Sequence, residues 1–157
     1  MTRFAAAAVV LGLALAVGAA APRAEPRPDG LVQVRSAHPL AETVARLQAG
    51  LAGRGIRQFD RIDQAALAAH AGITVRPSVL LVFGNPAVGG RFVAARAEAG
   101  LDWPVRLLVH EYADGAVWMT YTAFEWTAQR YGIDAHTAGF ETAAGVVAGL
   151  TAAAAAP

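Results

Sequence analysis

The sequence has 157 residues, 55% of them hydrophobic, and its 13 basic and 12 acidic residues give a formal net charge of +1. This balance argues against a nucleic-acid-binding protein, because such proteins carry a marked excess of basic residues. The chain has no cysteine, which excludes disulfides, thiolate nucleophiles and cysteine metal ligands.

The first segment has the pattern of an export signal. Arg3 provides a short positive region, residues 4–17 form an uncharged run rich in Ala, Val and Leu, and residues 18–20 are small. We expect a signal peptide over residues 1–20, cut after Ala20, and a periplasmic or secreted protein. An uncleaved anchor is the alternative, but the apolar run is shorter than the ~20 residues that span a bilayer.

Cleavage would leave equal numbers of arginines and acidic residues, and therefore a formal net charge of zero. We accordingly expect neither nucleic acid nor an anionic membrane surface as a partner, and no stable membrane insertion after the signal is removed. Residues 21–30, rich in Pro with charges and Gly, are predicted to be a linker. Residues 31–155 are then long enough for a single domain.

The domain is predicted to begin with a strand at 31–35 and a helix at 40–54. The apolar positions of this helix are spaced to form one face: Leu40, Val44, Leu47 and Leu51. A second strand is expected at 56–62, and its imperfect alternation suggests a β-bulge. Asp63 is placed to cap a short helix at 64–71.

An unbroken apolar run at 79–83 predicts a central strand buried on both faces. Pro77 precedes the run, and Gly84-Asn85-Pro86 ends it, because Pro86 has no N–H to give to a sheet. Residues 87–96 are then predicted to be helical despite Gly89-Gly90.

The last part of the chain predicts a hairpin followed by two helices. In the predicted strands at 105–110 and 117–121, one apolar set (Val105, Leu107, Val109 and Val117, Met119, Tyr121) alternates with a mixed set (Arg106, Leu108, His110 and Trp118, Thr120), and Asp114-Gly115 is the turn signal. A helix at 124–131 is expected to be capped by Thr122, and a long helix is expected at 137–155. The whole pattern predicts an α+β fold, with two long helices packed on one face of a largely antiparallel sheet.

At this point the chain resembles the bacterial domain-of-unknown-function family 302. The matching pieces are Glu42-Thr43-Val44 with Leu47, Phe59 to Asp63 with Ala65-Ala66, Gly72 before Arg76-Pro77, Phe83-Gly84-Asn85-Pro86, Leu101-Asp102-Trp103-Pro104, and Asp114-Gly115 with Trp118 and Tyr121. The resemblance implies a β-α-β(4)-α arrangement like one half of the TATA-binding-protein fold. It implies no activity, and in particular no DNA binding.

The turn that follows residues 79–83 and the nearby aromatic residues are the first candidate for a binding site. The candidate binding residues are Arg76, Gly84, Asn85, Pro86, Trp103, Trp118 and Tyr121. The competing structural interpretation is that Gly84 permits a tight turn, Asn85 hydrogen-bonds its own backbone and Pro86 begins a helix. We favour this interpretation for the turn, while exposed aromatic residues would favour a binding groove beside it.

An acid/base or metal-dependent enzyme is the alternative, and it would use Asp63, His70, His110 and Glu111. His110 and Glu111 are neighbours on a predicted strand, so their side chains point to opposite faces. The spacing of His70 and His110 does not indicate a metal site, and Ser78 lies outside any nucleophile motif. The four side chains would have to converge in one polar pocket to support an enzyme.

The sequence thus favours an exported, non-enzymatic domain that binds a small ligand or a protein partner, with no cofactor and no metal. A homo-oligomer formed through the sheet is left open.

Overall fold

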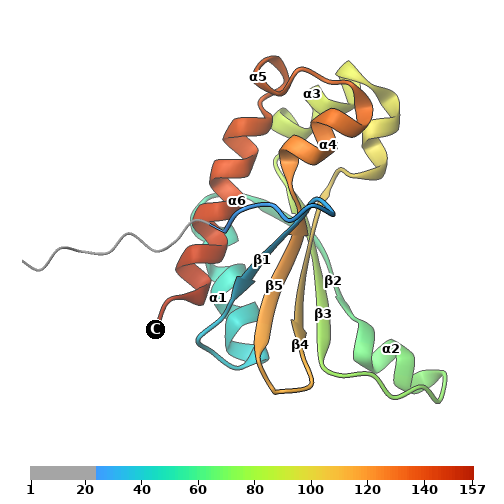
Figure 1. Cartoon of the computed structure of the whole chain (residues 1–157), viewed down its shortest axis with the longest axis vertical. Helices are drawn as coiled ribbons and strands as arrows, with labels where there is room; N and C mark the ends of the chain where they lie inside the picture. The colour runs from blue at the N-terminus through green and yellow to red at the C-terminus, as the bar shows by residue number, and fades with distance from the viewer. Residues whose placement is uncertain (1–23) are drawn as a thin grey trace, which may run out of the picture.

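One antiparallel five-stranded sheet forms the centre of the protein, in the order β1-β5-β4-β3-β2 (Figure 1). The structure is a computed structural model that describes residues 24–157, apart from the side chains of residues 137 and 138, so the expected signal peptide lies outside the described residues. The strands are β1 (Leu31–Arg35), β2 (Arg57–Asp63), β3 (Ser78–Gly84), β4 (Val105–Glu111) and β5 (Val117–Thr122).

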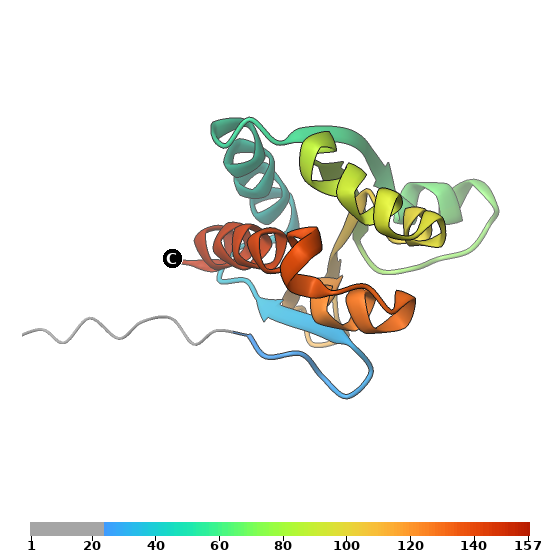
Figure 2. The ribbon, with the colours of Figure 1, turned by 90° about the horizontal axis from the view of Figure 1, so that it is seen from above.

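The two longest helices cover one face of this sheet and lie side by side (Figures 1 and 2). The helices are α1 (Leu40–Gly53), α2 (Gln64–His70), α3 (Pro86–Ala95), the 3-10 helix η1 (Ala97–Leu101), α4 (Phe124–Tyr131), α5 (Ala135–Ala138) and α6 (Phe140–Ala155). The predicted α+β class and the β-α-β(4)-α order of the main elements are confirmed.

The core lies between the sheet and helices α1 and α6. Alternate residues of β3 point into it: Leu81 is fully buried and Phe83 is 2% exposed. Each of these residues faces an apolar neighbour on β4, since Leu81 pairs with Leu107 and Phe83 with Val105. The apolar face of α1 contributes Val44, Leu47 and Leu51 to this core, as the spacing of these residues predicted.

The expectation that β3 is buried on both faces is wrong. Leu80 and Val82 point away from the helices and are only half-buried, and β4, not β3, occupies the middle of the sheet. Helices α1 and α6 lie on the opposite face (Figure 2). The continuous apolar run therefore predicted the strand correctly, but it did not mean that helices cover the second face of the sheet.

Capping and turn residues in the sequence correctly predicted several element boundaries. Asp63 caps α2 by accepting from the Ala66 N–H at 3.0 Å, and the register of β2 shifts between Gln58 and Asp60, as the expected bulge requires. Gly132 ends α4 in the left-handed conformation. The predicted cap at Thr122 is wrong, because Ala123 occupies the N-cap position of α4 and no side chain caps it.

The predicted long helix at 137–155 is also wrong in its first part. Gly139 has a φ of 80°, which separates the short helix α5 from α6. This left-handed residue turns the chain so that Phe140 enters the core, where its ring stacks on Phe92 at a centroid distance of 4.0 Å. Helices α3, α4 and α5 thereby gather with η1 at one end of the sheet (Figure 1).

Within residues 24–157, no helix has the length and apolar character needed to span a bilayer.

Candidate functional site

An apolar cleft of about 300 Å³ opens at the end of the sheet where β3 runs into α3. Its walls come from four regions that are distant in the sequence. They are the end of α1 with Ile56, the β3–α3 junction with Phe83, Val88 and Phe92, the start of β4 with Trp103 and Val105, and the helices that follow the hairpin, with Phe124, Ala143, Val146 and Val147. Small-molecule sites are commonly concave and apolar in this way, with few polar groups.

Trp103 forms one wall of the cleft and depends on two glycines. A Cβ at Gly84 would lie 3.0 Å from the indole Nε1, and a Cβ at Gly89 would overlap the same ring. Neither glycine has a positive φ. Gly84 is therefore explained by the close approach of Trp103 and not by the tight turn that the sequence suggested. Phe59 supports the outer side of the indole in an edge-on contact at 6.2 Å between ring centroids.

Four lining side chains carry polar groups: Arg54, Asn85, Trp103 and Thr142. Asn85 is the N-cap of α3, and its Oδ1 accepts from the Ala87 N–H at 2.9 Å. Pro86 occupies the first position of that helix, so the structural interpretation of this turn agrees with the structure at Asn85 and Pro86. Among the residues whose side chains the structure describes, none forms a hydrogen bond with the Trp103 indole N–H.

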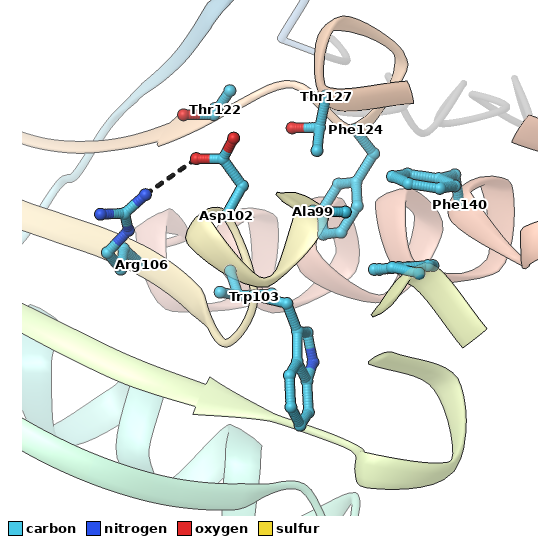
Figure 3. A pocket seen from close by; sticks show the side chains of 10 residues that line it. Ala99, Asp102, Trp103, Arg106, Thr122, Phe124, Thr127 and Phe140 are labelled. Atoms are coloured by element: carbon cyan, nitrogen blue, oxygen red, sulfur yellow. Dashed lines mark hydrogen bonds and ion pairs between the residues drawn. The ribbon is translucent and has the colours of Figure 1, made fainter. Parts of the chain in front are cut away.

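A second, much smaller hollow of about 30 Å³ lies behind Trp103, and Figure 3 shows the indole pointing away from Asp102. The Asp102 carboxylate accepts from Arg106 at 2.8 Å, from Arg130 at 3.3 Å and from the Tyr131 hydroxyl at 2.7 Å. The hydrogen bond to Asp102 raises the pKa of Tyr131, and burial and the carboxylate charge act in the same direction. This polar cluster ties the segment that carries Trp103 to α4.

The structure brings together only part of the predicted binding set. Gly84, Asn85 and Trp103 line the cleft, with Pro86 next to them in the chain. The other three lie elsewhere. Arg76 lies 3.7 Å from Glu111, Trp118 is half-buried on the sheet face opposite α1 and α6, and Tyr121 is buried in the core.

Most of the cleft was not predicted from the sequence. Phe92, Val105, Ala143 and Val147 follow the ordinary periodicity of buried helix and strand positions, so nothing distinguished them from the rest of the core. The sequence feature that could have pointed to the cleft was Gly89, because a glycine within a predicted helix is unfavourable unless another group packs closely against it.

None of the four residues of the enzyme alternative lines the cleft. Asp63 caps α2, His70 is exposed at the other end of that helix, and His110 hydrogen-bonds the Thr120 hydroxyl at 2.9 Å. Glu111 points to the opposite side of β4 from His110 and lies near Arg76. In the part of the chain that the structure describes, no three His, Asp or Glu side chains are grouped to hold a metal ion.

Comparison with protein families gives a match over residues 32–156 to the model described as "Domain of unknown function DUF302". Among solved structures, the crystal structure of an uncharacterized conserved DUF302 protein from Bacillus stearothermophilus is similar, with a TM-score of 0.66 and 18% identity, covering 80% of this chain and 95% of that one. This likeness supports the fold.

Two curated relatives are proteins named fluoride-specific ion channels. FluC 1 of Brucella suis biovar 1 (strain 1330) is 39% identical over 105 residues, which cover 67% of this chain and 41% of that protein. FluC 2 of Brucella melitensis biotype 1 is also 39% identical over 105 residues, 39% of its length. The chain thus spans about two fifths of the curated relatives that it matches.

Proposed function

The chain belongs to the DUF302 family, and from this premise we propose that the domain is a binding module whose cleft beside Trp103 takes up a small, largely apolar molecule. The observation that carries the proposal is the cleft itself: about 300 Å³ of space with almost entirely apolar walls. Exposed apolar surface is costly in a folded domain, and a concave apolar site is therefore a strong candidate for ligand binding.

We propose that the domain binds its ligand and does not transform it. None of Asp63, His70, His110 and Glu111 lines the cleft. The carboxylate beside the cleft, Asp102, already accepts hydrogen bonds from two arginines and a tyrosine. General acid–base catalysis requires a titratable group within hydrogen-bond reach of the reacting atom.

We propose, further, that the domain acts outside the cytoplasm. The support is the charged, apolar and small-residue pattern of residues 1–20, together with the neutral formal charge of the remaining chain.

Binding to the cleft is tested with the neutral fluorophore N-phenylnaphthylamine and a pair of matched variants. Ala143→Phe places a ring in the cleft, whereas Ala153→Phe places the same ring on an exposed position of α6 outside the cleft. We expect the wild type and Ala153→Phe to bind the fluorophore with equal affinity and Ala143→Phe to lose at least tenfold. Equal binding by all three proteins, with unchanged melting temperatures, would contradict the proposal.

A second candidate function is supported by the relatives that are named fluoride-specific ion channels. They contain a segment 39% identical to this chain within a longer protein, so we propose that the domain works beside a membrane ion channel in its own cell. The test is growth of a strain that lacks the domain, with and without added fluoride. A fluoride-dependent growth defect that the intact gene restores would support this role, and equal growth would contradict it.

A further inference from the structure

The polar side chains in the cleft offer more hydrogen-bond donors than acceptors, and none of the acceptors is charged. Arg54 has five N–H groups and no acceptor, and the Trp103 indole has a single N–H. Asn85 uses one lone pair of its side-chain oxygen to cap α3, and its NH₂ group adds two more donors. The remaining side-chain acceptors are the Thr142 hydroxyl and the second lone pair of the Asn85 oxygen, and no acidic residue lines the cleft.

Arg54 carries the one formal charge of the lining, and that charge is not neutralised by the protein. One of its N–H groups donates to the Gly50 carbonyl at 3.1 Å, and it forms no ion pair within residues 24–157. Two acidic residues of the neighbouring segments, Asp102 and Glu141, lie beside other side chains. Asp102 lies 2.8 Å from Arg106, and Glu141 lies 2.9 Å from His136.

We infer that the ligand is a monocarboxylate: a small acid with an aromatic or branched apolar body that fills the cleft, and a carboxylate that is held by Arg54 and the Trp103 N–H. This inference rests on the proposed function of the cleft and adds the chemical class of the ligand. A guanidinium matches a carboxylate geometrically, because two parallel N–H groups can donate to its two oxygens.

Two other classes of ligand fit the donor set less well. An ammonium compound would meet the Arg54 charge without a carboxylate in the lining to compensate for it. A phosphate monoester carries close to two negative charges at neutral pH, and only one cation lines the cleft. One unpaired guanidinium balances one carboxylate, and the unpartnered indole N–H gains a charged acceptor.

The experiment uses three probes that share one apolar body: naphthoate, naphthamide and naphthylmethylammonium, each titrated into the full domain by calorimetry. We expect naphthoate to bind at least tenfold more tightly than naphthamide, and the ammonium compound to bind most weakly. Added salt should weaken naphthoate binding and leave naphthamide binding nearly unchanged, since only the former involves a charge pair.

Arg54→Gln and Arg61→Gln form the matched pair of variants. Both arginines are exposed, so both variants should fold normally, but Arg61 lies on β2 outside the cleft. We expect Arg54→Gln to reduce naphthoate affinity to the level of naphthamide and to leave naphthamide unchanged, and Arg61→Gln to change neither.

The outcomes separate the two proposals. If all three probes bind with similar affinity and Ala143→Phe abolishes their binding, the cleft is a binding site but the carboxylate inference is overturned. If naphthoate binds best but Arg54→Gln does not weaken it, the assignment of Arg54 is overturned. If none of the probes binds, both the carboxylate inference and the proposed function of the cleft fail.

Discussion

Gly89 and Trp103 occupy the same space: a Cβ at Gly89 would overlap the Nε1, Cε2 and Cδ1 atoms of the Trp103 indole. The cleft exists in its present form because α3 has no side chain at this position. The neighbouring residue Gly90 has open space around it. Two adjacent glycines in one helix therefore have different roles.

We predict that Gly89→Ala destabilises the domain by about 1–3 kcal/mol, because the new methyl group forces Trp103 out of its place. Gly90→Ala should instead stabilise it by up to about 1 kcal/mol, since alanine is the better helix former. Urea unfolding of the two variants measures both effects. Equal effects of the two substitutions would show that Trp103 moves without cost.

A second prediction concerns the two faces of β3. Leu81→Asp should prevent folding, because an unpaired charge in the apolar core costs several kcal/mol, a large part of a domain's stability of about 5–15 kcal/mol. Leu80→Asp should fold, since Leu80 points to the half-exposed face. Circular dichroism and thermal unfolding of both variants provide the measurement. A cooperatively melting Leu81→Asp protein would contradict this arrangement of the strand.

The third prediction separates capping from ligand binding at Asn85. Asn85→Ala removes the acceptor for the Ala87 N–H and should cost about 1 kcal/mol of stability. Affinity for naphthoate should change by less than tenfold, because Arg54 and Trp103 remain in place. Asn85→Ser, which can still cap the helix, should recover most of the stability. Unchanged melting of Asn85→Ala together with abolished binding would instead make Asn85 a ligand-binding residue.

The fourth prediction is a pH dependence at His110. Burial lowers the pKa of His110 below its ordinary value of about 6.5. The unfolded chain therefore binds this proton more readily than the folded protein, so the free energy of unfolding should fall as the pH drops below about 6.5. His110→Gln should flatten this part of the stability profile. An NMR titration that places the pKa of His110 at or above 6.5 would contradict the prediction.

The fifth prediction concerns export. When the full-length gene is expressed in a Gram-negative bacterium, the protein recovered from the periplasm should begin near Ala21, because residues 1–20 carry a complete signal pattern. Replacing Leu11 and Leu13 with Arg should retain the protein in the cytoplasm by breaking the apolar region. Periplasmic protein that begins at residue 1 or 2 would contradict cleavage.

Local interactions made much of the fold predictable from the sequence. Asp63 and Asn85 cap helices through hydrogen bonds within three residues of the chain, and such bonds depend on no distant partner. The hairpin of β4 and β5 is indicated by two β-rich segments on either side of the Asp114-Gly115 turn. Patterning and turn residues predicted the order of the strands and helices, and the family resemblance, which the match over residues 32–156 confirms, implied nearly the same order.

Tertiary packing alone decided the rest. Trp103, Trp118 and Tyr121 are all large aromatic residues, yet they lie in a cleft wall, on a half-exposed sheet face and in the core. Gly139, Gly145 and Gly149 look alike in a helical pattern, but only Gly139 has a positive φ and breaks the helix. Glycine adopts a negative or a positive φ at little cost, so the burial of Phe140 decides which of the two Gly139 adopts. The cleft was also decided by tertiary packing, because its walls come from segments that meet only when α3 and α6 pack over the end of the sheet.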